Sequence, residues 1–197
     1  MRSLLLAVAL LSPIEQLDWA VAERVQQVAQ EQRAHHSAWY PVMRAATSWG
    51  RPVVVVSGLV VIVAADLLSG YGWGTARLAV AALAGTNLLV EVGKRVVNRP
   101  RPDGEHKRSN SSFPSSPAAN AFALAWVLSA RWKRGWPLFA ALALLVAASR
   151  VYLNRHFVSD VVAGALLGVV VACVAQHWLP LPRGSKAKAP REGTITV

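Results

Sequence analysis

The sequence predicts an all-α protein, a polytopic transmembrane helical bundle of five to six spans with an N-terminal amphipathic interfacial helix. Hydrophobic residues make up 54% of the 197 residues and charged residues only 16%, which is too apolar for an ordinary soluble domain. Long apolar runs recur along the chain, as membrane spans require. Tryptophans lie at or near the ends of these runs, where interfacial belts form: Trp39, Trp49, Trp73, Trp132, Trp136 and Trp178.

The formal net charge of +11 has two interpretations. Basic loops could hold the protein against anionic lipid, or basic residues could bind an anionic substrate. We predict no nucleic-acid partner, because the apolar spans leave no soluble domain to bind one. The only cysteine, Cys173, lies in an apolar run, so an intramolecular disulfide is excluded.

Residues 1–36 form a predicted anchor and amphipathic helix. The apolar run 4–11 follows Arg2 and stops at Ser12-Pro13. It is similar to a signal-peptide core, but it has no convincing small-residue cleavage site and is short for a span, so we interpret it as an interfacial anchor. Residues 14–34 place apolar side chains at helical spacing, with charged and amide side chains on the other face. Such a helix either lies in the membrane plane or packs against its own protein.

Residues 37–179 form the predicted membrane bundle, with apolar runs at 52–68, 76–92, 118–130, 137–148 and 157–178 and a further entry segment at 42–49. The third and fourth runs are shorter than the roughly 20 residues that a bilayer needs. Their polar ends, at 115–116 and 149–150, must therefore reach into the membrane. Polar groups at that depth face a cavity or partners rather than lipid, which indicates a functional site there.

Two further features concern the last run and the tail. Gly164 and Gly168 are four residues apart, so another helix can approach closely. Residues 180–197 form a basic tail that we predict to be disordered. The positive-inside rule makes this tail and the basic turn 131–134 cytoplasmic. The 94–116 loop and the 149–156 turn then lie on the opposite face, where we interpret the remaining cations as functional.

The central motif is S-R-V-Y-L-N-R-H-F-V-S-D, residues 149–160. If the chain is helical from Phe157, His156 and Asp160 share one helix face. Asp160 can then accept a hydrogen bond from one ring nitrogen and leave the other with a free lone pair, which makes His156 a competent nucleophile or base. Arg150 offers a fork that suits phosphate oxygens. The alternative is a basic interfacial junction in which His156 only caps a helix.

Two more segments on the same predicted face suit a phosphate. In K-R-V-V-N-R-P-R-P, residues 94–102, Lys94 and Arg101 supply charge, and the prolines stiffen the loop. In S-F-P-S-S-P, residues 112–117, Ser115 and Ser116 stand at a helix start. Unpaired N–H groups and the helix dipole attract an anion at such a position. The three segments together are hard to explain as packing.

These three segments resemble the signature of the type 2 phosphatidic-acid phosphatase family of membrane lipid phosphatases, which shares its site with vanadium haloperoxidases. The family pattern is K-x6-R-P, then P-S-G-H, then S-R-x5-H-x3-D. Residues 94–102 and 149–160 match the first and third parts fully. The resemblance implies a helical bundle that dephosphorylates a lipid phosphate without a metal or another cofactor. We expect it in the bacterial inner membrane, with the site on the extracytoplasmic face.

The resemblance also implies a role for each matching residue. His156 attacks phosphorus to give a phosphohistidine, and Asp160 orients His156. The phosphate-binding residues are Lys94, Arg101 and Arg150, which hold the phosphate by charge, and Ser115 and Ser116, which donate hydrogen bonds to it.

The middle segment departs from the family pattern, since it reads Pro114-Ser115-Ser116-Pro117. In the family the fourth residue is the histidine that protonates the leaving oxygen, and Pro117 has no proton to give. Loss of general-acid help costs about 10²–10⁴-fold when the leaving group is an alkoxide. A phosphate, whose last pKa is about 6, departs without that help. We therefore expect a lipid diphosphate, such as a polyprenyl diphosphate, to be favoured over a monophosphate.

Other interpretations stay open at this position. The chain could be a non-catalytic relative that binds or transports phosphorylated lipid, or Pro117 could be a substitution introduced into an active enzyme. His106, in the loop before the middle segment, is either a displaced acid or an exposed histidine.

Overall fold

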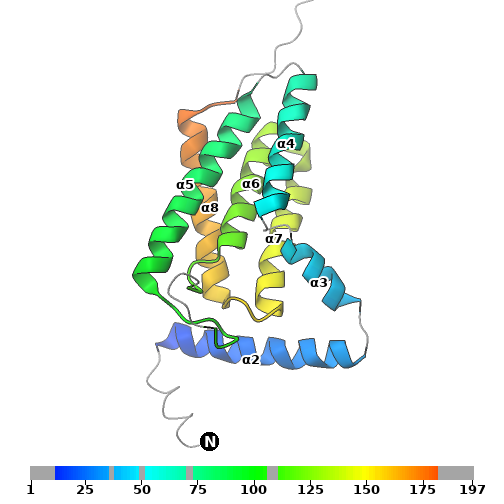
Figure 1. Ribbon diagram of the computed structural model, residues 1–197, viewed down its shortest axis with the longest axis vertical. Coiled ribbons are helices and arrows are strands. Elements are labelled where there is room, and N and C mark those ends of the chain that lie inside the picture. The colour runs from blue at the N-terminus through cyan, green and yellow to red at the C-terminus, as the bar shows by residue number, and fades with distance from the viewer. Residues whose placement is uncertain (1–11, 36–37, 49–51, 70–72, 106–110, 182–197) are drawn as a thin grey trace, which may run out of the picture.

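The computed structural model describes residues 12–35, 38–48, 52–69, 73–105 and 111–181, and its elements there are all helical (Figure 1). In chain order they are α2 (Pro13–Ala34), α3 (Trp39–Ser48), α4 (Pro52–Leu68), α5 (Gly74–Val97), α6 (Ser116–Arg131), the 3-10 turn η2 (Lys133–Gly135), α7 (Trp136–Tyr152) and α8 (Val158–Trp178). The predicted all-α class is confirmed. The N-terminal anchor, Trp49, His106 and the basic tail from 182 lie outside the described residues.

Helix α6 lies at the centre of the bundle, between α5, α7 and α8. Its buried residues are small, since Ala118, Ala119 and Ala123 are fully covered. Helix α8 approaches α6 through Gly164 and Gly168, where an added Cβ would collide with the carbonyl oxygens of Ser115 and Ala119. The predicted close helix approach at these glycines is confirmed.

Three helical segments are long and apolar enough to cross a membrane: Gly74–Val97, Lys133–Tyr152 and Val158–Trp178. Helix α4 has 17 residues and α6 has 16. At 1.5 Å per residue they are about 24–26 Å long, short of the roughly 30 Å hydrocarbon core. The expectation of five to six spans therefore stays a prediction beyond these three.

Helix α2 begins with a capping box, in which Ser12 is the N-cap and Pro13 the first helical residue. The Ser12 hydroxyl accepts from the backbone N–H of Glu15 at 3.3 Å, and the Ser12 N–H donates to the Glu15 carboxylate at 3.0 Å. Proline is well tolerated at the first helical position, where no intrahelical partner for an N–H exists.

Helix α2 runs across the end of the bundle, below α7 and α8 in Figure 1. The face with Asp18, Ala22 and Ala29 is buried against the rest of the protein. The apolar side chains of Ile14 and Leu17 are each 65% exposed. The helix therefore packs on its own protein through small residues and leaves an apolar face outward, which suits a membrane interface.

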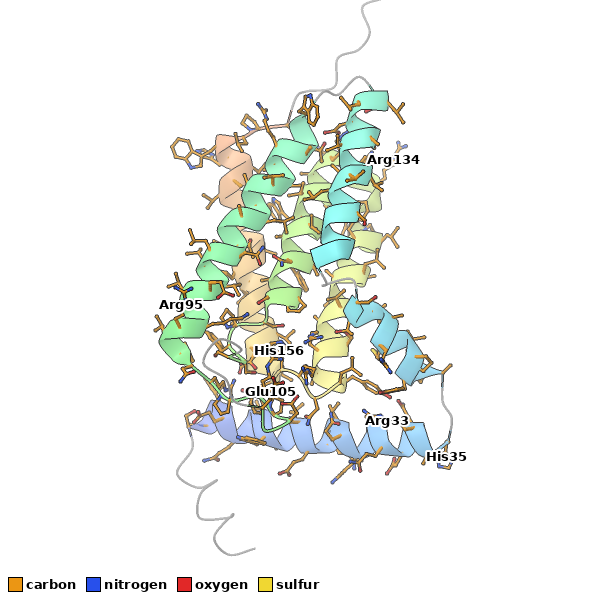
Figure 2. The ribbon with its side chains drawn as sticks, viewed as in Figure 1. Arg33, His35, Arg95, Glu105, Arg134 and His156 are labelled. Atoms are coloured by element: carbon orange, nitrogen blue, oxygen red, sulfur yellow. The ribbon has the colours of Figure 1, made fainter. Side chains whose placement is uncertain are left out.

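The opposite end of the bundle carries Arg134, far from His156 (Figure 2). Here the buried carboxylate of Asp66 caps α5, because it accepts from the backbone N–H and the hydroxyl of Thr75, each at 2.8 Å. Arg131 lies 3.6 Å from the same carboxylate. A carboxylate at a helix N-terminus is stabilised by the helix dipole, so Asp66 fixes the α4–α5 connection.

Candidate active site

His156 lies in the turn between α7 and α8. The carbonyl oxygen of Arg150 accepts from the backbone N–H groups of Arg155 at 3.0 Å and His156 at 3.3 Å. The chain therefore turns back on the end of α7 before α8 begins. This turn buries the imidazole, which is only 2% exposed.

The orientation of the His156 ring comes from the Ser112 carbonyl oxygen, which lies 2.8 Å from Nδ1. A carbonyl oxygen can only accept, so Nδ1 carries the hydrogen and Nε2 carries the lone pair. The histidine thus has the tautomer that a nucleophile or a base requires.

The predicted hydrogen bond between His156 and Asp160 is wrong. Oδ2 of Asp160 lies 3.9 Å from Nδ1, beyond hydrogen-bond distance. The reason is that α8 begins at Val158, so His156 precedes the helix instead of sharing its face. Asp160 folds back to accept from the N–H of Phe157 at 2.8 Å and accepts from the hydroxyl of Ser112. Asp160 therefore reaches the imidazole through Ser112.

Asp160 is also bound by Arg99, one of the loop cations to which the sequence analysis assigned no specific role. Nη1 of Arg99 lies 2.8 Å from Oδ1 of Asp160, and Nη2 lies 2.9 Å from Oδ2 of Asp18 on α2. The guanidinium also stacks 4.2 Å from the centre of the Phe157 ring. Burial opposes the charge, but the hydrogen bonds to Asp18 and Asp160 outweigh it and raise the pKa of Arg99.

Three cations predicted from the sequence lie around His156. Burial is the main cause that lowers the pKa of His156 well below its usual value, and repulsion from Arg150 and Arg101 lowers it further, with Lys94 contributing less. These cations come from α7, from the 98–115 loop and from the last turn of α5. The structure thus brings residues from three distant segments to one place.

The 98–115 loop is tied to the turn that carries His156. Nη1 of Arg101 donates to the carbonyl oxygen of Arg155 at 2.9 Å, and Arg155 pairs with Asp103 at 2.7 Å. Arg101 is 6% exposed; burial first, and then repulsion from Arg155, lowers its pKa. These contacts hold the Arg101 guanidinium beside the histidine.

Two buried donors at the site have no hydrogen-bond partner within the described part of the chain: the Ser115 hydroxyl and Nε of Arg150. Nη1 of Arg150 donates to the Thr47 hydroxyl on α3. The backbone N–H of Ser115 donates to the Asp160 carbonyl oxygen at 3.0 Å. Ser116 is half-buried as the first residue of α6. An unsatisfied buried donor is costly, and an anion with several acceptor oxygens would satisfy both.

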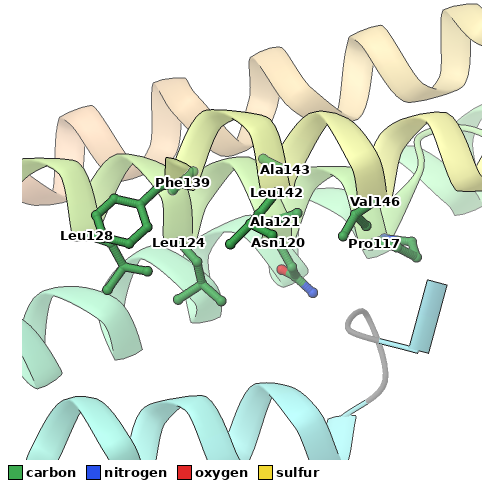
Figure 3. Close-up of a pocket in the computed structure, with 10 residues that line it drawn as sticks. Pro117, Asn120, Ala121, Leu124, Leu128, Phe139, Leu142, Ala143 and Val146 are labelled. Carbon is green, nitrogen blue, oxygen red and sulfur yellow. The ribbon is translucent and has the colours of Figure 1, made fainter. Parts of the chain in front are cut away.

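Pro117, at the altered position, is the second residue of α6 and lines one end of an apolar cavity of about 120 Å³ between α6 and α7 (Figure 3). Asn120, one turn further, also lines this cavity and pairs with Asn87 of α5 at 3.1 Å. The other lining residues are apolar: Ala121, Leu124, Ala125, Leu128, Phe139, Leu142, Ala143 and Val146. The possible displaced acid, His106, lies outside the described residues.

Two known proteins are similar to this chain in sequence. The chain is 30% identical to the lipid A 1-phosphatase of Porphyromonas gingivalis over 161 residues, 71% of this chain and 35% of that protein. It is 36% identical to phosphatidylglycerophosphatase B of Bacillus subtilis over 97 residues, 43% of this chain and 48% of that protein. The chain thus spans about a third to a half of the length of these relatives.

Two solved structures are similar to this chain in fold. The crystal structure of the transmembrane PAP2 type phosphatidylglycerolphosphate phosphatase from Bacillus subtilis matches with a TM-score of 0.71 and 27% identity, covering 89% of this chain and 90% of that one. Aquifex aeolicus LpxE matches with a TM-score of 0.57 and 25% identity, covering 68% and 83%. The family profile of the PAP2 superfamily matches residues 75–183, more than half of the sequence. The chain therefore belongs to the PAP2 superfamily, among relatives that are membrane lipid phosphatases.

Proposed function

We propose that the protein hydrolyses a phosphorylated lipid, with a lipid diphosphate favoured, through a phosphohistidine at His156. The observation that carries this proposal is the 2.8 Å contact from Nδ1 to the Ser112 carbonyl oxygen, which leaves Nε2 as the basic ring atom. The lowered pKa of His156 keeps Nε2 unprotonated at neutral pH. Three nearby cations supply the charge that a phosphoryl group needs.

The proposed reaction has two steps, formation of the phosphohistidine and its hydrolysis. Lys94, Arg101 and Arg150 bind the phosphate oxygens, and the hydroxyl of Ser115 donates to one of them. Nε2 of His156 attacks phosphorus, the bond from phosphorus to the leaving oxygen breaks, and the leaving group departs with the electron pair. Water then attacks the phosphohistidine, Nε2 regains its lone pair, and inorganic phosphate leaves with the protons of that water shared between phosphate and solvent.

The leaving group decides the substrate. Pro117 cannot protonate a departing alkoxide, whereas a phosphate with a pKa of about 6 leaves without protonation. The apolar cavity beside Pro117 (Figure 3) has the lining that a hydrocarbon chain requires. A polyprenyl diphosphate satisfies both conditions, because it combines a phosphate leaving group with an apolar chain.

The orientation in the membrane follows from the two ends of the bundle. His156 and Arg134 lie at opposite ends (Figure 2). The positive-inside rule assigns the end with Arg134 and the basic tail to the cytoplasm. The site then faces the extracytoplasmic side of a bacterial inner membrane. Labelling of cysteines placed at 103 and 134 with an impermeant maleimide in intact cells tests this, since only the former should react.

The experiment that tests the activity is a phosphate-release panel in one detergent. The substrates are phosphatidate, phosphatidylglycerophosphate and a polyprenyl diphosphate, each with and without a chelator. We expect the diphosphate to turn over faster and the chelator to have no effect. Equal or faster release from the monophosphates would refute the diphosphate preference. A ³²P-labelled substrate quenched during turnover should leave an acid-labile, base-stable label that His156→Asn abolishes.

One observation favours a second function, binding of phosphorylated lipid without hydrolysis. Pro117 removes the expected proton donor, whereas Arg150, Arg101 and Lys94 remain near His156. In that case the protein would bind the lipid and release no phosphate, and no label would form on His156.

A further inference from the structure

The structure assigns to Asp18, on the N-terminal helix α2, the role of a positioning residue for the catalytic centre, acting through Arg99 on Asp160. This inference rests on the proposed function of His156. With this role for Asp18, α2 contributes to the catalytic centre and is not only a membrane anchor.

The carboxylate of Asp18 is 3% exposed although it lies on a helix at the edge of the molecule. Its Oδ1 accepts from the backbone N–H of Ser159 at 3.0 Å. Its Oδ2 accepts from the hydroxyl of Ser159 and from Nη2 of Arg99 at 2.9 Å. Ser159 is the second residue of α8, whose N-cap residue, Phe157, offers no polar side chain. Asp18 therefore caps α8 from another helix.

Arg99 is shared between two carboxylates. One amino group binds Asp160 at 2.8 Å and the other binds Asp18 at 2.9 Å. While Asp18 is present, its carboxylate neutralises part of the positive charge of the Arg99 guanidinium. Less of that charge then acts on Asp160. Without Asp18, Arg99 would act on Asp160 alone and cancel more of its negative charge.

Asp160 matters because the groups around His156 are otherwise cationic. The charged groups that face the imidazole are Arg150 of α7, Arg101 of the 98–115 loop, Lys94 of α5 and Asp160 of α8. The imidazole becomes positive as the phosphohistidine forms, and the carboxylate 3.9 Å away stabilises that charge. Asp18 preserves this stabilisation by drawing Arg99 toward itself.

The test is Asp18→Asn, which keeps the shape and removes the charge. We expect kcat to fall about 10–100-fold, the effect of losing one charged hydrogen bond, with little change in KM. The acid limb of kcat/KM should move to lower pH, because a site with one less negative charge protonates His156 less readily. Asp18→Glu keeps the charge and should keep the limb in place.

The matched control is Asp66→Asn. Asp66 is also a buried carboxylate that caps a helix in another segment and faces an arginine, but it lies at the other end of the bundle. It should lower thermal stability and leave the acid limb unmoved. An equal movement of the limb in both variants, or an unchanged kcat and limb in Asp18→Asn, would overturn the inference.

If Asp18→Asn does not fold, Asp18→Ser decides, because a serine hydroxyl can still accept from the Ser159 N–H but carries no charge. Its acid limb should also move to lower pH, and an unmoved limb would overturn the inference. If the wild-type protein releases no phosphate from any lipid, the proposed function fails. If the wild type is active and Asp18→Asn matches it, only the role of Asp18 fails.

Discussion

Nδ1 of His156 lies 2.8 Å from the carbonyl oxygen of Ser112, so the imidazole ring is oriented by the 98–115 loop rather than directly by a carboxylate. The backbone N–H of Ser112 is in turn held by the carbonyl oxygen of Arg99 at 2.8 Å. The loop that carries Arg101 is thus the same loop that sets the tautomer of His156.

The pH profile should reflect the buried His156. Burial, and then repulsion from Arg150 and Arg101, lowers the pKa of His156. In the proposed mechanism the neutral ring is the reactive form. We expect kcat/KM to be level above about pH 6.5, the usual histidine pKa, and to fall only at lower pH. Arg101→Gln should lower the overall rate and move the acid limb upward, because one repulsive charge is gone.

The pH dependence of the free energy of unfolding should also depend on His156. Below about pH 6.5 the unfolded chain binds a proton at His156 that the folded protein does not bind. The free energy of unfolding contributed by His156 therefore falls as the pH decreases from that value toward the folded pKa. Chemical denaturation in detergent between pH 7.5 and 5.5 measures this, and His156→Gln should flatten the dependence.

Ser112→Ala tests the indirect link between Asp160 and His156. The variant removes the hydroxyl that donates to Asp160 but keeps the carbonyl that binds the ring. We expect a roughly tenfold loss in kcat, typical of one charged hydrogen bond, and a larger loss for Asp160→Asn. The double variant should resemble Asp160→Asn alone.

The comparison variant is Ser129→Ala, whose hydroxyl donates to the Ala125 carbonyl oxygen of its own helix. It should match the wild type. Additive losses in the Ser112 and Asp160 variants would contradict a shared pathway.

Pro117→His should restore a proton donor beside the leaving oxygen. We expect hydrolysis of a lipid monophosphate to rise about 10²–10⁴-fold, the usual benefit of general-acid catalysis, while diphosphate hydrolysis changes much less. Parallel phosphate-release assays on both substrates measure the ratio. No gain on the monophosphate would show that Pro117 is not what limits the reaction.

Gly168→Val should break the contact between α8 and α6. A Cβ at this position collides with the backbone of Ala119, and backbone cannot move aside cheaply. We expect a loss of at least about 1–3 kcal/mol, the typical cost of overpacking, seen as a lower unfolding temperature. Gly58→Val is the control, since nothing lies within 4 Å of an added Cβ there.

Much of the fold follows from periodicity and apolar run length. Those signals find each helix of the bundle but misplace its ends. Helix α5 continues to Val97, past the predicted end at 92, because Lys94 and Arg95 interrupt the apolar pattern without interrupting the helix. Helix α6 is correctly found but too short for a span by length alone, and its central place comes from small residues that no run length reports.

The site is predictable only where its residues form a motif. Lys94, Arg101 and Arg150 have fixed spacing to proline, serine or histidine, whereas Asp18 is one carboxylate on an isolated helix. Its partners Arg99 and Ser159 are 81 and 141 residues away along the chain. The available signal was a lone Asp on the same helix face as Ala22 and Ala29. The hydrogen bond between His156 and Asp160 was wrongly predicted because the start of α8 was placed one residue early, at Phe157 instead of Val158.

The contacts of Asp18 on α2 with Arg99 and with Ser159 on α8 also determine when the site can assemble during synthesis. Asp18 precedes Arg99 in the chain, and both precede Ser159 and Asp160, which belong to the last helix that the structure describes. During synthesis α2 therefore emerges before its partners, and the contacts of Asp18 with Arg99 and Ser159 form only after α8 has been made. A chain cut before α8 would lack Ser159 and Asp160, and with them the contacts that hold α2 to the site.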